Sequence, residues 1–169
     1  MFHAPQQKRR AILYSWVLLL TAIPMFSAWG RPLLGVLRSF LPTEGLAAIM
    51  LLVSLASVIA CILWLQREGK NYRTILLFIG WVIPLFLFLP LSLPVVEERL
   101  HFLLFGGLGF FSMLLFSFPV AVAVTLLYGG LDELWQWVLP DRFGDWRDVG
   151  INAVAGMGGV IAAWLGKRR

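Results

Sequence analysis

The stretch LAAIMLLVSLASVIACILWL, residues 46–65, decides the class of this fold. Its 20 residues carry no charge, and about 20 apolar residues are what a helix needs to cross the hydrocarbon core of a bilayer. Lipid offers the backbone no hydrogen bonds, so such a stretch must be helical. The whole chain shares this character, since 60% of its 169 residues are hydrophobic, 14% are charged, and its mean hydropathy is +0.84. Soluble domains are about 45–50% apolar and about 25% charged, so the composition excludes a soluble globule and predicts an integral membrane protein.

Further apolar runs lie on both sides of this stretch, each ended by polar or turn-forming residues. The six runs are 11–29, 46–65, 74–94, 100–117, 119–139 and 149–166. We predict an all-α, polytopic membrane protein with about six transmembrane helices in a single bundle, forming one domain over residues 1–169.

Two segments are expected to depart from a plain transmembrane helix. The third run contains three prolines, Pro84, Pro90 and Pro94, which predict an irregular helix because proline removes a backbone donor. The stretch 31–41 is interpreted as a short interfacial helix, because Arg31 and Arg38 lie seven residues apart, two turns along one face.

The basic residues favour one orientation of the chain. If both termini and the loops 66–73 and 117–119 share one side, that side holds nine of the fourteen Lys and Arg residues. The positive-inside rule then places both termini in the cytoplasm. The net charge of +5 does not indicate nucleic acid, because the basic residues lie at the ends of apolar runs, where they contact lipid headgroups. The predicted partner is the lipid bilayer.

Polar residues from three predicted helices and from the loop 140–148 meet at the outer end of the bundle. They are His101, Asp132, Glu133, Gln136, Arg142, Asp148 and Asn152. If its helix begins near Pro119, Asp132 lies about 20 Å along it at ~1.5 Å per residue, still inside a core about 30 Å thick. An acid costs roughly 2.5–3.5 kcal/mol at a helix centre on insertion scales and less nearer the surface. We therefore expect Asp132 and Glu133 to face protein or a wet cavity, with Arg142 or Arg147 returning to neutralise an acid.

Some of these residues also have purely structural interpretations. Asp145 or Asp148 is suited to cap the last helix. Asn152 is suited to a plain hydrogen bond between helices, and the segment 97–99 is interpreted as a solvated loop. The glycines at 106, 107, 109 and 159 are expected to let helices pack closely. Cys61 is the single cysteine, which excludes an intrachain disulfide and a cysteine-based metal site.

Two stretches of the C-terminal half carry a family resemblance. They are LHFLLFGGLGF (100–110) and YGGLDELWQWVLPDRFGDWRDVGINAVAGMGG (128–159). A His-Phe pair opens one helix and Asp-Glu-x-x-Gln lies near the end of the next. A Pro-x-Arg loop and Asp-x-x-x-Asn-x-x-x-Gly follow. The region of about 100–160 thereby resembles the VanZ-like family of small bacterial membrane proteins, whereas the first three runs add only hydropathy.

The resemblance implies a cellular location and a general role. It implies a multi-pass protein of the bacterial inner (cytoplasmic) membrane with a role in the cell envelope. The family is named for an accessory protein of glycopeptide resistance that lowers sensitivity to teicoplanin, so antibiotic resistance is one implied context. The resemblance assigns no reaction.

Three functions are compatible with the pattern. In the first, the polar residues form a binding site for the headgroup of a lipid-linked envelope precursor, or for another membrane protein, with Arg142 suited to phosphate. In the second, the protein is a membrane-embedded hydrolase or transferase acting on a phosphate- or glycan-bearing lipid, with His101, Asp132 and Glu133 as candidate catalytic residues. Oxygen ligands with one histidine would suit Mg²⁺ or Mn²⁺, but we assign neither a metal site nor a cofactor.

The third function is a transporter or proton relay, which needs polar residues along a path through the membrane. Below Asp132 the last three runs offer little beyond Ser112, Ser117 and Thr125. We therefore favour the binding or accessory role over the enzyme, and both over the transporter.

Overall fold

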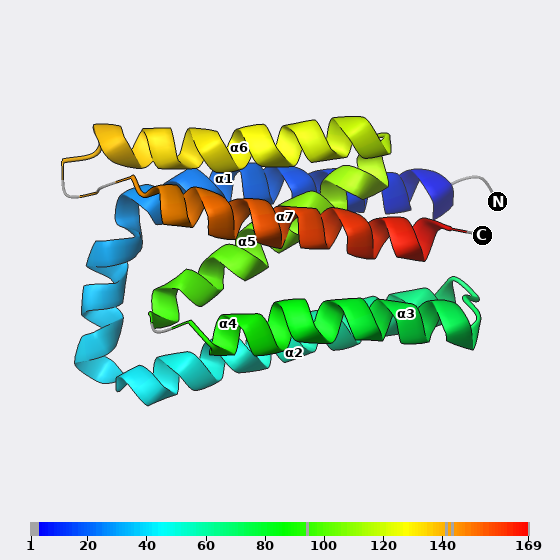
Figure 1. The fold of residues 1–169 in the computed structure, drawn as a ribbon, viewed down its shortest axis with the longest axis horizontal. Coiled ribbons are helices and arrows are strands. Elements are labelled where there is room, and N and C mark those ends of the chain that lie inside the picture. Colours follow the sequence, from blue (N-terminus) through cyan, green and yellow to red (C-terminus); the bar gives the residue numbers. More distant parts are fainter. Residues whose placement is uncertain (1–3, 94, 141, 143, 169) are drawn as a thin grey trace.

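A computed structural model describes residues 4–93, 95–140, 142 and 144–168, and no strand occurs among them (Figure 1). The helices are α1 (Ala4–Phe40), α2 (Thr43–Arg67), α3 (Tyr72–Ile83), α4 (Leu89–Leu91), α5 (Arg99–Leu115), α6 (Phe118–Val138) and α7 (Trp146–Lys167). Five helical stretches are long and apolar enough to cross a membrane, and α5 is a shorter apolar helix of 17 residues. The prediction of an all-α polytopic bundle is confirmed.

The prolines act differently in the first and third predicted helices. Pro84 opens a π-helical stretch, Pro84–Phe88, that joins α3 to α4 and confirms the irregular third helix; Pro94 lies outside the described residues. The expected end of the first helix near residue 29 is wrong, because α1 continues through Pro24 and Pro32 to Phe40. A proline can kink a helix instead of ending it, and the last third of α1 turns to lie across the end of the bundle (Figure 1). The segment 31–41 is thus not a separate helix, although most of it has the crosswise direction expected of an interfacial one.

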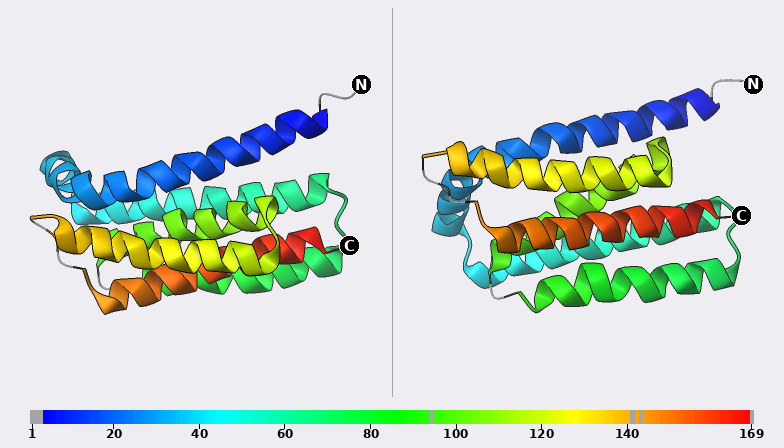
Figure 2. Two further views of the ribbon diagram at one scale, coloured as in Figure 1. Left: turned by 90° about the horizontal axis from the view of Figure 1, so that it is seen from above. Right: turned by 45° about the horizontal axis from the view of Figure 1, so that its top comes forward.

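The two ends of the bundle are distinct. Both chain termini, the α2–α3 turn and the α5–α6 turn lie at one end, which we call the terminal end (Figures 1 and 2). The bend of α1 and the α4–α5 and α6–α7 connections lie at the opposite end, which we call the far end. This arrangement agrees with the loop sides predicted from the basic residues.

The central helix of the bundle is α5, which contacts α1, α2, α6 and α7. Its Phe105 and Leu108 are fully buried. Against α7 the contact is backbone to backbone, since a Cβ at Gly109 would overlap the carbonyl oxygen of Gly156. A Cβ at Gly159 would likewise overlap the carbonyl oxygen of Gly106. The expectation that these glycines permit close packing is confirmed, and it brings the middle of α5 against the middle of α7.

Candidate functional site

Four helices contribute polar side chains to one cluster at the far end, and all of them are buried except the half-buried His101. These are Ser27 from α1, His101 from α5, Asp132, Glu133 and Gln136 from α6, and Asn152 from α7. Asn152 is 0% exposed and each of the two acids is at most 5% exposed. Buried polar groups persist only when hydrogen bonds satisfy them, so the bonds among these six residues define the cluster.

The end of α6 places two carboxylates side by side and satisfies both. Gln136 Nε2 donates to Asp132 Oδ2 at 3.2 Å and to Glu133 Oε1 at 3.0 Å. These contacts follow from the i, i+4 and i, i+3 spacing on one helix. From α1, Ser27 Oγ donates to Asp132 Oδ1 at 2.5 Å. Both oxygens of Asp132 therefore accept a hydrogen bond inside the protein.

Glu133 fixes the start of α7. Its Oε2 accepts from the backbone N–H of Asp145 at 3.2 Å, and its Oε1 accepts from Asn152 Nδ2 at 3.3 Å. The Asp145 side chain caps α7 by accepting from the Arg147 N–H at 2.9 Å. The capping prediction is thus confirmed for Asp145, whereas Asp148 lies in the first turn of the helix.

His101 joins α5 to the same cluster. Its Nδ1 lies 2.6 Å from Asn152 Oδ1. Because the amide NH₂ of Asn152 already donates to Glu133, its Oδ1 is the acceptor and His101 Nδ1 carries the hydrogen. The ring stacks on Phe105, with centroids 6.0 Å apart. In the neutral ring, Nε2 is then left with its lone pair for another partner.

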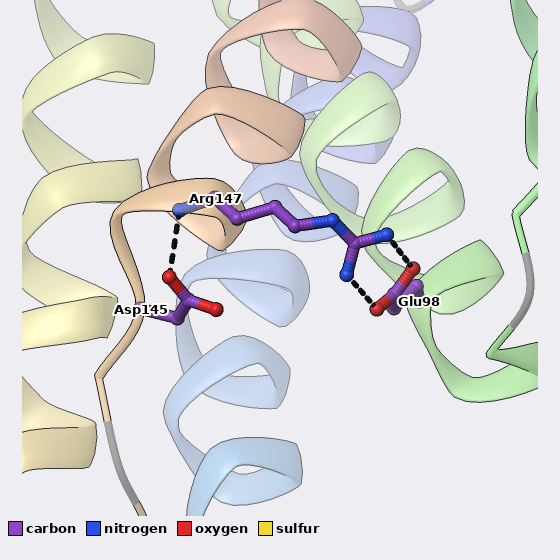
Figure 3. A network of polar contacts seen from close by, with 3 residues as sticks. All are labelled: Glu98, Asp145 and Arg147. Atoms are coloured by element: carbon purple, nitrogen blue, oxygen red, sulfur yellow. Dashed lines mark hydrogen bonds and ion pairs between the residues drawn. The ribbon is translucent and has the colours of Figure 1, made fainter.

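A second polar contact closes the far end beside this cluster. Arg147 of α7 makes a two-pronged ion pair with Glu98, whose Oε2 lies 2.8 Å from Arg147 Nη2 (Figure 3). Glu98 is only 8% exposed, so the interpretation of 97–99 as a solvated loop is wrong there; the Glu97 side chain lies outside the described residues. A short 3₁₀ turn, Val96–Glu98, brings this carboxylate against α7. Arg147 thus neutralises an acid as expected, but that acid is Glu98 and not a carboxylate of α6.

A cavity of about 740 Å³ opens in front of the cluster, between α1, α5, α6 and the α6–α7 loop. Its polar lining is Ser27, Arg31, Arg38, Glu98, His101, Asp132, Gln136, Arg142 and Asp148. The rest is apolar and comes mainly from α1 and α5, with Phe26, Leu34 and Leu104 among its members. The volume lies within the range of about 300–1,000 Å³ that is usual for small-molecule sites.

Arg142 occupies the loop side of this cavity. Its Nε is buried and has no hydrogen-bond partner among the described residues. Burial lowers the pKa of its guanidinium, and the nearby charge of Arg31 lowers that pKa further. That pKa is raised by three nearby acids, which are Asp132, Glu133 and Asp148.

The structure brings all seven predicted polar residues to the far end, in two layers. His101, Asp132, Gln136, Arg142 and Asp148 line the cavity. Glu133 and Asn152 lie behind them and hold His101 and Gln136 by hydrogen bonds. The described residues include no group of three His, Cys, Asp or Glu side chains that could hold a metal ion.

Sequence reasoning missed Ser27, Glu98 and Arg31 as members of this region. Ser27 lies in an apolar run, and nothing in its neighbourhood distinguishes it from other serines of such runs. The sequence pattern places Arg31 on a short interfacial helix with headgroup contacts, and not at the polar site. The available signal was their level in the bundle, since both come near the far end of the first helix, where the motif residues gather.

Comparison with known proteins supplies the family. The VanZ/LLP1 family model matches residues 11–167. No curated protein and no solved structure matches the chain. The match also extends over the first three helices, where we expected hydropathy alone, and so covers nearly the whole bundle that builds the cavity. This chain belongs to the VanZ/LLP1 family of proteins.

Proposed function

We propose that this protein binds the headgroup of a lipid-linked precursor of the bacterial cell envelope in the far-end cavity. In this proposal it is a binding or accessory protein of the inner membrane, with both termini in the cytoplasm and the cavity at the outer leaflet. The nine basic residues assigned to the terminal end support that orientation through the positive-inside rule.

The observation that carries the proposal is the mixed lining of the cavity. Ionisable side chains of both signs share it with apolar side chains of α1 and α5. A water-soluble ligand would leave the apolar wall unused, and an acyl chain alone would leave the charges uncompensated. A lipid with a polar headgroup matches both parts of the lining.

Each lining residue then has a role set by its chemistry. The Arg142 guanidinium offers the planar donors that suit phosphate. Asp132 and Asp148 accept from hydroxyl or amine groups, and His101 Nε2 accepts or donates according to its protonation. The positioning residues are Glu133, Gln136 and Asn152, because their hydrogen bonds hold His101 and Asp132 in place.

One observation favours a second candidate, a membrane-embedded hydrolase or transferase acting on a phosphate- or glycan-bearing lipid. The Ser27 hydroxyl lies 2.5 Å from a carboxylate oxygen of Asp132, and both residues line the cavity. A hydroxyl beside a base is the arrangement that a nucleophile requires. His101, Asp132 and Glu133 are the further candidate catalytic residues.

Native mass spectrometry of the gently purified chain tests the proposal. We expect the wild type to retain a lipid of defined mass, and the Asp132→Asn, Glu133→Gln double variant to lose it. Glu44→Gln is the matched control, because it removes an exposed acid near the far end that is outside the cavity lining. A wild type that retains no specific lipid would refute the proposal. A product mass that forms from the retained lipid, and fails to form with Asp132→Asn, would favour the enzyme.

A cellular assay addresses the proposed link to resistance. Teicoplanin binds cell-wall precursors, so a protein that holds such a precursor would reduce the access of the antibiotic to it. We expect expression of the wild type, but not of the double variant, to raise the teicoplanin concentration that inhibits growth. Equal inhibition of both strains would mean that this protein does not contribute to teicoplanin resistance.

A further inference from the structure

We propose that Arg31 and Arg142 hold a phosphate group between them, and that the carboxylates of the same cavity select a headgroup that carries hydrogen-bond donors. This inference deepens the proposed function and rests on it. It narrows the ligand to a lipid phosphodiester whose headgroup carries hydrogen-bond donors.

Arg142 is the first half of the phosphate site. It comes from the loop between α6 and α7 and lines the cavity, and its buried Nε lacks a partner among the described residues. A buried donor without an acceptor costs free energy that a ligand oxygen would recover. The guanidinium presents Nε–H and an Nη–H on one edge, which matches two oxygens of a phosphate.

Arg31 is the second half and comes from a different element that lines the cavity. It lies on α1, in the segment that passes over the far end, and it lines the same cavity. Its charge is near enough to lower the pKa of Arg142, which means that the two cations oppose each other. An anion bound between two like charges in a partly buried cavity converts that repulsion into two attractions.

The acids of the cluster leave the Nε–H of Arg142 without an acceptor. Both oxygens of Asp132 already accept hydrogen bonds from Ser27 and Gln136, and Glu133 is committed to Asp145 and Asn152. Arg142 makes no hydrogen bond to any of these carboxylates that would satisfy its Nε. The acids are close enough to act on Arg142 electrostatically, but they do not fill its donor.

The acids instead restrict the rest of the headgroup. Asp132 and Asp148 line the cavity together with Arg142. Carboxylates accept hydrogen bonds and repel further phosphate groups. A headgroup that extends from the phosphate must therefore offer donors. A glycerol or sugar hydroxyl, or an amine that carries N–H groups, offers them, whereas a trimethylammonium group does not.

Lipid binding to the purified full-length chain in detergent tests this inference with four probes. Phosphatidylglycerol carries a phosphate and hydroxyls, phosphatidylcholine a phosphate without donors, diacylglycerol no phosphate, and glycerol 1-phosphate no acyl chains. We expect phosphatidylglycerol to bind at least about tenfold more tightly than each of the others, since one charge-assisted hydrogen bond is worth about tenfold or more.

Variants of the two arginines test whether each contacts the lipid. Arg142→Gln and Arg31→Gln should each weaken phosphatidylglycerol binding by about tenfold or more. Arg142→Lys should retain more binding than Arg142→Gln, because lysine keeps the positive charge and loses only the planar set of guanidinium donors. Arg73→Gln, at the terminal end, is the matched control and should bind as the wild type does. Unfolding temperatures of all four variants identify any that fails to fold, and Arg142→Lys keeps the test valid if Arg142→Gln does.

The outcomes separate this inference from the proposed function. If wild type and both Gln variants bind phosphatidylglycerol equally, while the Asp132→Asn, Glu133→Gln variant loses it, the phosphate site is refuted and the proposed function stands. Equal binding of phosphatidylcholine refutes selection by hydrogen-bond donors. Binding of glycerol 1-phosphate as tight as that of phosphatidylglycerol refutes a lipid source for the phosphate. If the wild type retains no lipid at all, the proposed function itself fails.

Discussion

Replacement of Gly159 by alanine should separate the two helices that hold the cluster together. A Cβ at this position would overlap the carbonyl oxygen of Gly106 and lie 2.9 Å from the backbone nitrogen of Phe110. Both neighbours belong to the backbone of α5, so no side-chain rotation can relieve the overlap. The helices must move apart, and overpacking of this kind typically costs about 1–3 kcal/mol.

Gly150→Ala is the matched control on the same helix. A Cβ there meets nothing within 4 Å, so the substitution brings only the gain in helix propensity, about 1 kcal/mol. Gly159→Ala brings the same gain in helix propensity. The difference in stability between the two variants therefore measures the cost of the overlap alone. At roughly 2–4 °C per kcal/mol for a chain of this size, we expect Gly159→Ala to unfold about 2–12 °C below Gly150→Ala.

The assay is thermal unfolding in one detergent, followed by tryptophan fluorescence. His101 on α5 bonds to Asn152 on α7 at 2.6 Å, so Gly159→Ala should also reduce lipid retention in native mass spectrometry. If Gly159→Ala unfolds at the temperature of Gly150→Ala or above it, then α5 and α7 do not meet through their glycines, and the packing argument is refuted.

Three other perturbations test separate features. Ser27→Ala leaves a buried oxygen of Asp132 without its donor and should lower the free energy of unfolding by about 1–3 kcal/mol; the control Ser57→Ala removes an exposed hydroxyl and should change it by less than about 0.5 kcal/mol. Arg147→Gln leaves the buried Glu98 without its cation, so adding Glu98→Gln should restore part of the lost stability, and no restoration would mean that the pair is not formed. In a Cys61→Ser chain, a membrane-impermeant maleimide should label Glu44→Cys in intact cells and Arg67→Cys only after lysis; the opposite result would place the termini outside.

Much of the fold follows from local sequence. Hydropathy over about 20 residues determines where a helix crosses the membrane, because the backbone has no other way to satisfy its hydrogen bonds in lipid. The spacing of Asp132, Glu133 and Gln136 places them near one another on a single helix, and the bonds of Gln136 to both acids follow from it. The order of spans and turns also determines that the helix ends carrying His101 and Asn152 lie at the same end of the bundle.

Contacts between distant segments depend on how the helices cross. Ser27 reaches Asp132 across 105 positions of sequence, and no local pattern separates it from serines that bond to their own helix. The first helix is expected to end near residue 29 but continues through Pro32, because whether a proline stops or bends a helix depends on what the next turn can pack against.

The sequence by itself determined the membrane class, the apolar helical runs and the polar residues available at the far end, since these depend on residues near in sequence. Only the tertiary structure decided that Glu98 pairs with Arg147, that Arg31 faces the cavity of Arg142, and that a cavity exists there. These features require the bend of α1 and the close glycine contact of α5 with α7. Both arise from packing between helices, where shape over the whole bundle, and not the pattern of any one segment, sets the distances.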